Sequence, residues 1–274
     1  MTQTPPRRLL VLRLEARGCE AEAWINGIAV ARVDAACQRL LVPVHEYVVE
    51  GANHIELRLW PASAGAAAGP LAPGVERLCD GAERARLQLL LADSDLPTQG
   101  NDGRALARID WTPAAGEVCT TPLGLRRQAL LPVRFPRWRW CDTPRIEDPA
   151  AVLPAVRTLL RQWSQALSGG HSAGFLVATR LRTAELSVAY GWSAGAAEGR
   201  LRAHLAALHR DGMRAWLPGP EDELVLRPVA DGRLLECLGA GGACALRTRP
   251  GGDGASCSLP LRVALVGNRP QVLR

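Results

Sequence analysis

The spacing of apolar residues changes near the middle of this 274-residue chain. In the first half, apolar and polar residues alternate, and residues 54–60 predict a half-buried strand. Its inward positions are Ile55, Leu57 and Leu59. In the second half, Ala151–Leu167 carries apolar residues three or four positions apart, as an amphipathic helix does. The change of period predicts a β-rich N-terminal half followed by an α+β C-terminal half.

A short turn motif organises the first half. Asn26-Gly27 separates two apolar runs, which predicts a β-hairpin because a type I′ turn needs a positive φ at both central residues. Leu40–Val44 predicts another strand, and Pro43 places it at an edge or a bulge. Residues 61–75 are small and predict a loop. Further strands are expected at Leu9–Leu14, Ala85–Leu91 and Ala105–Trp111.

Three stretches of the first half resemble the galactose-binding-like jelly roll, namely Trp24–Val30, Val42–Tyr47 and Glu50–Leu57. The resemblance covers hairpin and turn residues and implies a β-sandwich for residues 1–146. Modules of this kind accompany glycoside hydrolases and other multidomain proteins, so the resemblance makes carbohydrate a possible partner. It assigns no sugar-contacting residue in this chain.

The second half, residues 147–274, is expected to contain three helices followed by strands. Ala151–Leu167 ends at the stop signal Ser168-Gly169-Gly170, and helices at Phe175–Tyr190 and Leu201–His209 follow. The order of elements is similar to a cystatin-like or NTF2-like α+β cone, in which a curved sheet wraps helices. The expected strands are Leu224–Pro228, Leu234–Leu238, Ala243–Thr248 and Leu259–Val266.

Composition narrows the classes of function. Hydrophobic residues make up 47% and charged residues 22% of the chain, the balance of a globular protein. All 33 basic residues are arginine, scattered among acids without a run of five like charges, which argues against nucleic acid as a partner despite the charge of +6. No apolar run is long enough to span a membrane. Neither an uninterrupted N-terminal apolar stretch nor a cleavage site is found, so we expect a cytoplasmic, bacterial protein.

The motifs that suggest catalysis or metal binding have structural explanations. Gly170–Gly174 matches the Gly-x-Ser-x-Gly nucleophile elbow, but a helical pattern precedes it, so we expect a helix–helix turn with Ser172 as cap. His204 and His209 are five apart and share no helical face. The glycine-rich stretches 239–242 and 250–254 predict hairpin loops, and Glu221–Glu223 a solvated strand entry. The eight cysteines lack zinc-ligand spacing and predict reduced thiols. We therefore expect no catalytic residue, metal or cofactor, and no enzyme.

The candidate binding residues are Arg137, Trp138, Arg139 and Trp140. In a strand, the tryptophans would face one side and the arginines the other. The segment is then either two buried tryptophans under a charged face or a partner-binding patch, because Trp and Arg dominate interface hot spots. We predict a protein that binds another protein, as an adaptor, a specialised chaperone or a toxin-neutralising immunity protein. The alternatives are a carbohydrate-binding protein and an enzyme or ligand binder with a pocket in the C-terminal half.

Overall fold

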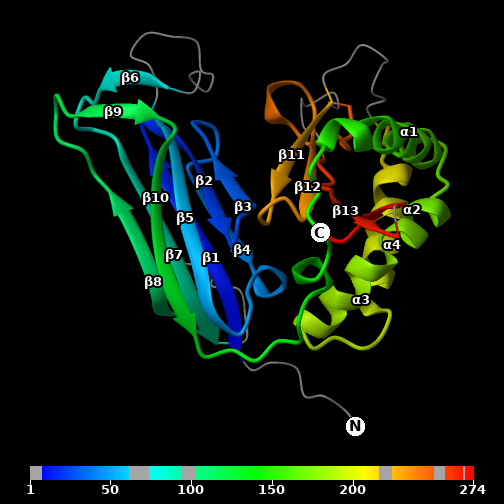
Figure 1. The fold of residues 1–274 in the computed structure, drawn as a ribbon. Helices are drawn as coiled ribbons and strands as arrows, with labels where there is room; N and C mark the ends of the chain where they lie inside the picture. Colours follow the sequence, from blue (N-terminus) through cyan, green and yellow to red (C-terminus); the bar gives the residue numbers. More distant parts are fainter. Residues whose placement is uncertain (1–7, 62–73, 94–102, 216–223, 250–256, 268) are drawn as a thin grey trace. The chain divides into compact units, whose positions relative to one another are not determined.

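The computed structural model describes residues 8–61, 74–93, 103–215, 224–249, 257–267 and 269–274 (Figure 1). The chain forms two compact units, the N-terminal unit Met1–Pro136 and the C-terminal unit Arg137–Arg274. The sequence places this boundary near residue 146. Trp138 lies on the C-terminal side because its ring centroid is 5.5 Å from the guanidinium carbon of Arg274.

The N-terminal unit consists of antiparallel strands (Figure 1). One four-stranded sheet has the order β4-β1-β7-β8 and a second has the order β10-β5-β2-β3, while β6 and β9 form a two-stranded ribbon. The strands are β1 (Arg8–Arg17), β2 (Cys19–Ile25), β3 (Ile28–Val33), β4 (Arg39–Pro43), β5 (Gly51–Pro61), β6 (Val75–Leu78), β7 (Arg84–Asp93), β8 (Arg104–Trp111), β9 (Val118–Thr121) and β10 (Leu123–Leu131), with the 3-10 turn η1 (His45–Tyr47) between β4 and β5.

One hydrophobic core joins the two sheets. Leu10, Leu12 and Leu14 of β1 belong to the same buried cluster as Leu57 and Leu59 of β5. The alternation predicted for β5 is therefore confirmed, since its apolar positions are at most 1% exposed. Burial of these side chains is the main force that holds the unit together.

The predicted hairpin turn is confirmed, because Asn26 and Gly27 have φ values of 50° and 74°. The amide of Asn26 also links this turn to the start of β5. Its Nδ2 donates to Tyr47 O at 2.9 Å and to Asn53 Oδ1 at 2.8 Å, and its Oδ1 accepts from His54 N at 3.0 Å. Asn53 is fully buried and donates to the Val49 carbonyl. Asn26 and Asn53 thus link the β2–β3 hairpin turn to the segment between η1 and β5.

Strand prediction succeeds where the pattern is regular and fails where it is not. Pro43 ends β4, which is an edge strand as predicted. The sequence pattern does not indicate β6, β9 or β10. In β10 the alternation is hidden because Arg126 and Arg127 occupy its centre, although the strand pairs with β5 along its whole length.

The C-terminal unit combines helices with a four-stranded antiparallel sheet of order β11-β12-β13-β14 (Figure 1). The predicted first helix is confirmed, and it begins where Asp148 accepts a hydrogen bond from Ala150 N and Pro149 opens the first turn. The elements of the C-terminal unit are η2 (Arg139–Cys141), α1 (Pro149–Ser168), α2 (Ala173–Ala178), α3 (Arg180–Ala189), α4 (Ala196–Arg210), β11 (Val225–Val229), β12 (Leu234–Leu238), η3 (Ala240–Gly242), β13 (Arg262–Val266) and β14 (Arg269–Val272).

Three predictions for this unit need correction. The helix expected at 175–190 is broken at Thr179, whose hydroxyl donates to the carbonyl of Phe175 and competes with the helical ladder. Residues 243–248 form only isolated bridges rather than a strand. The strand expected from Leu259 begins at Arg262, because Pro260 has no N–H to give the ladder.

Two further expectations concern loops. Gly239–Gly242 includes the turn η3, where Gly241 and Gly242 have positive φ. Residues 62–73 of the predicted small-residue loop, the stretch 250–254 and Glu221–Glu223 lie outside the described residues. Of the helices in the described parts of the chain, none has both the length and the apolar character needed to cross a membrane.

Candidate functional site

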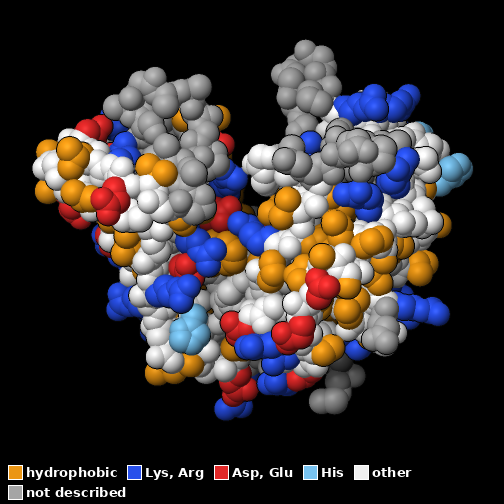
Figure 2. Space-filling model, turned by 45° about the horizontal axis from the view of Figure 1, so that its top comes forward, with side chains coloured by type: hydrophobic (Ala, Val, Ile, Leu, Met, Phe, Trp, Pro, Cys, Tyr) orange, Lys and Arg blue, Asp and Glu red, His pale blue; other side chains and the backbone are white. Residues whose placement is uncertain are grey.

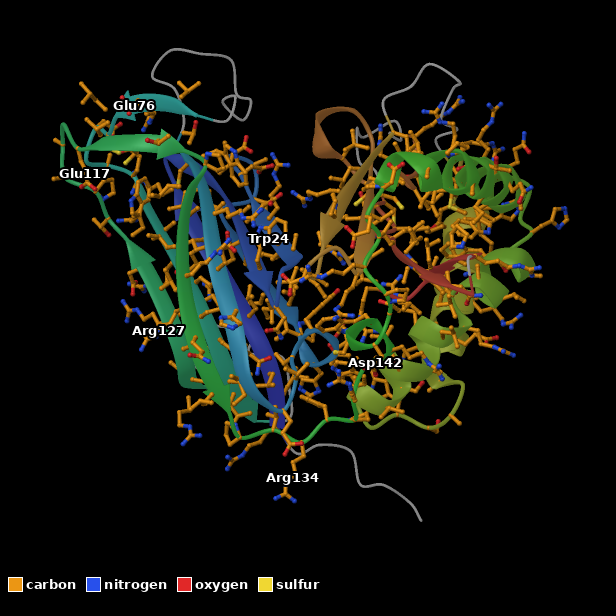
Figure 3. The ribbon with its side chains drawn as sticks, viewed as in Figure 1. Trp24, Glu76, Glu117, Arg127, Arg134 and Asp142 are labelled. Atoms are coloured by element: carbon orange, nitrogen blue, oxygen red, sulfur yellow. The ribbon has the colours of Figure 1, made fainter. Side chains whose placement is uncertain are left out.

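The predicted binding residues Arg137–Trp140 do not form a strand. They lead from an extended segment into η2, and Trp138 and Trp140 are only 1% and 6% exposed. The structure therefore agrees with the first interpretation of this segment, in which the tryptophans are buried and the arginines face outward. The arginines are 70% and 62% exposed at their side chains. Arg137 pairs with Asp142 at 2.7 Å, and Asp142 is labelled in Figure 3.

An ion pair with a buried arginine holds the backbone of this segment in place. Arg274 is 1% exposed, and its Nη1 donates to Glu185 Oε2 at 2.6 Å. The other oxygen of Glu185 accepts the backbone N–H of Arg139 at 2.8 Å. Because a buried guanidinium is costly without a carboxylate, Glu185 ties the end of the chain to η2. The tryptophans thus contribute packing, and only Arg137 and Arg139 offer surface to a partner.

The Gly-x-Ser-x-Gly match lies between two helices, as predicted. Ser172 precedes α2, and its carbonyl accepts from Leu176 N at 3.0 Å. Its side chain makes no capping hydrogen bond, so the expected cap is wrong in that detail. Within the described residues no group of three or more His, Cys, Asp or Glu side chains could hold a metal ion.

The N-terminal unit has a pocket that the sequence pattern does not indicate. It has a volume of about 590 Å³, and we call it the end pocket because the strands that line it begin or finish there. Register explains the gathering, since Leu10 pairs with Leu91 and Leu91 pairs with Arg104 across three neighbouring strands. Its lining residues are Arg8, Leu10, His45, Leu91, Arg104, Leu106, Pro132, Val133, Arg134 and Phe135.

The described side chains that line the end pocket carry charge of one sign. Arg8, Arg104 and Arg134 are all exposed, and among the described residues of the lining none is acidic. Among the described residues, neither Arg104 nor Arg134 pairs with a carboxylate. Figure 3 shows the side chain of Arg134 pointing outward. Arginine presents a planar fork of donors that matches a carboxylate or a phosphate.

Aromatic and apolar side chains form part of the lining of the end pocket. His45 is 1% exposed, and its Nε2 accepts the N–H of Leu10 at 2.8 Å, so the ring is fixed against β1. The ring of Phe135 lies 5.1 Å from that of His45, tilted by 47°. Because Phe135 and Leu106 are only partly buried, the lining of the pocket also has exposed apolar surface. The pocket can therefore receive an anionic group and an apolar group together.

A second depression in the same unit has a different character. Its volume is about 480 Å³, and its lining includes both acids and bases. Arg39 pairs with Glu15 at 3.2 Å, and Arg86 pairs with Asp110 at 2.8 Å. These arginines already have carboxylate partners, so the end pocket is the better candidate for an anionic ligand.

Comparison with protein-family models, with curated proteins and with solved structures finds no match for this chain. The assignment of a function rests on the geometry of the site alone. The sequence offered only weak signals for the end pocket, since its arginines lie at positions 8, 104 and 134 in three separate segments.

Proposed function

We propose that this protein binds another protein and that the end pocket receives an acidic segment of that partner. The supporting observation is the set of three exposed arginines in a pocket whose lining also has exposed apolar surface. Carboxylates of the partner would pair with Arg104 and Arg134, and an apolar side chain would cover Phe135. A protein of this kind would act as an adaptor, a specialised chaperone or an immunity protein against a toxin.

Peptide binding tests the proposal directly. Three labelled peptides of equal length would alternate Glu with Leu, Gln with Leu, and Glu with Ser, and fluorescence anisotropy would report binding. We expect the Glu/Leu peptide to bind most tightly, because it alone carries both features of the ligand. Its affinity should fall as salt is raised, since the exposed charges are screened.

Charge reversal identifies the pocket. The double variant Arg104→Glu/Arg134→Glu should weaken the Glu/Leu peptide by about tenfold or more, because attraction becomes repulsion. Arg127→Glu is the matched control, as Arg127 is an exposed arginine on β10 of the same unit and does not line the pocket. Equal binding of the Gln/Leu peptide, or unchanged binding by the double variant, would refute the proposal. Glycans that bind while the peptides do not would instead favour the carbohydrate alternative.

The proposal includes a domain arrangement. We propose that the N-terminal unit is a jelly-roll-like module and the C-terminal unit a separate α+β domain, because each has its own buried cluster. Residues 1–136 and 137–274, produced separately, should each unfold cooperatively in urea. If either fragment lacks a cooperative transition, the two units do not fold as independent domains.

We also place this function in the cytoplasm. All eight cysteines are free thiols, which suits a reducing compartment. Fractionation of cells that express the native protein tests this, and recovery in a secreted or envelope fraction would contradict it.

A further inference from the structure

The β6–β9 ribbon holds two thiols that face each other. Cys119 belongs to β9, and Cys79 directly follows β6. Their Sγ atoms are 2.8 Å apart although the residues are 40 positions apart in the chain. The backbone fixes this approach, because Cys79 N donates to Glu117 O and Gly116 N donates to Cys79 O, both at 2.8 Å. The sulfur atoms therefore need to approach by only about 0.8 Å to reach bonding distance.

The surroundings separate this pair from the other cysteines. Both thiols are 3% exposed and belong to the core of the N-terminal unit. Exposed side chains, among them Leu78 and Val118, cover the outer side of the ribbon, and Figure 2 shows hydrophobic and acidic groups gathered there. The pair thus belongs to a two-stranded ribbon that forms a sheet separate from the two larger ones.

We propose that Cys79 and Cys119 are a redox-modification site that closes into an intramolecular disulfide on contact with a low-molecular-weight disulfide. One thiol loses its proton to solvent and attacks the reagent, forming a mixed disulfide and releasing one thiolate. The second thiol, after losing its proton, attacks the protein sulfur of that mixed disulfide and releases the other thiolate. Two protein thiols are oxidised and one reagent disulfide is reduced to two thiols.

The charged groups nearby affect the rate rather than the geometry. Burial, and then the hydrogen bond with Cys79, raise the pKa of Cys119 to about 11. Glu117 raises this pKa further and Arg77 lowers it, while Arg77 itself pairs with buried Glu83. Cys19, near Cys79, has its pKa raised to about 11, mainly by burial. Since only the thiolate reacts, closure should be slow at neutral pH and faster at alkaline pH.

The consequence for the fold is a closed loop. The segment between the two cysteines contains β7 and β8, which form half of the β4-β1-β7-β8 sheet. A bond between Cys79 and Cys119 would join the two ends of this segment covalently. Cross-linking restricts the unfolded chain, so the oxidised protein should resist heat better than the reduced protein.

Oxidation with glutathione disulfide tests the site. The experiment uses the full chain with Cys37→Ser, which removes the exposed cysteine. After oxidation at pH 7 and pH 9, remaining thiols are alkylated in denaturant and tryptic peptides are identified by mass spectrometry. We expect a peptide linking Cys79 to Cys119, more of it at pH 9, and a rise in the unfolding midpoint on the order of 10 °C.

Matched variants decide the outcome. Cys79→Ser and Cys119→Ser should each abolish the cross-link and the rise in midpoint, whereas Cys19→Ser should keep both. The midpoint of each reduced variant shows whether it is folded. Fully alkylated Cys79 and Cys119 after oxidation at pH 9, or a cross-link that joins Cys19 instead, would overturn the proposal.

Discussion

In the C-terminal unit, Arg262 and Arg274 are almost completely buried and each meets a carboxylate within 2.7 Å. At the end pocket of the N-terminal unit, Arg104 and Arg134 are exposed and have no carboxylate partner among the described residues. A buried arginine must be paired because its desolvation is otherwise too costly. An exposed arginine costs little to leave unpaired, so it stays available for a ligand. Burial together with pairing therefore separates arginines that maintain the fold from arginines that can recognise a partner.

The largest expected effect comes from the buried side of the Arg137–Trp140 segment. Trp138→Ala should lower the free energy of unfolding by about 3–5 kcal/mol, because it leaves a cavity beneath the ion pair of Arg274 and Glu185. Arg137→Ala, the neighbouring exposed change, should cost less than about 1 kcal/mol. Urea unfolding followed by circular dichroism measures both. Similar losses for the two variants would mean that the segment is not divided into a packed side and an exposed side.

The buried carboxylate of Glu236 is the next test. It accepts hydrogen bonds from Arg227 Nε at 2.9 Å and from Arg262 Nη2 at 2.7 Å. Glu236→Gln should destabilise the protein by about 3 kcal/mol, since two guanidinium groups lose their counter-charge. Glu76→Gln, at an exposed position on β6, is the control that should leave stability almost unchanged. A loss below about 1 kcal/mol for Glu236→Gln would remove the contrast between the two units.

The pocket arginines should contribute little to folding. Arg104→Ala/Arg134→Ala is expected to change the free energy of unfolding by less than about 0.5 kcal/mol, because neither side chain has an ion pair among the described residues. The same variant should still lose affinity for the Glu/Leu peptide. If its stability falls as far as that of Glu236→Gln, these arginines serve the fold and the binding proposal weakens.

The smallest effect concerns pH. A hydrogen bond from Arg108, and secondarily one from Arg86, lowers the pKa of Asp110 below its usual value. The ionised carboxylate therefore stabilises the folded form at a pH above about 4, the unfolded value. This contribution is lost as the pH falls through the lower folded pKa. Because all three side chains are partly exposed, Asp110→Asn should cost less than about 1 kcal/mol at pH 7, and this cost should shrink as the pH falls through the folded pKa. A loss that does not shrink as the pH is lowered from 7 into the acid range would contradict this assignment.

Local patterns predict the elements of this fold better than its sites. The Asn26-Gly27 turn, the alternation of β5 and the helical spacing of α1 follow from neighbouring residues and are confirmed. Alternation in Arg137–Trp140 indicates two faces, but the sequence alone does not say which face is buried. That depends on Glu185 and Arg274, which lie far along the chain.

The end pocket and the thiol pair were missed for a related reason. Leu10, Leu91 and Arg104 meet only through the register of three strands, and Cys79 meets Cys119 through that of the ribbon. Such meetings depend on strand pairing over long separations, which spacing between neighbours does not reveal. The sequence does not indicate β10, because the arginines at its centre interrupt the alternation of apolar and polar residues. Without that strand, the residues that follow it cannot be placed at the end pocket, which they line.

The contact between Asn26 and Asn53 limits how this chain can diverge. Asn26 Nδ2 donates to Asn53 Oδ1, so replacing either residue removes this hydrogen bond, although each amide also bonds to the backbone. Once one of these two residues is replaced, replacing the other removes less stabilisation, because the hydrogen bond between them is already lost. The two positions should therefore vary as a pair among any descendants of this sequence, and the loss from the double replacement should be smaller than the sum of the two single losses.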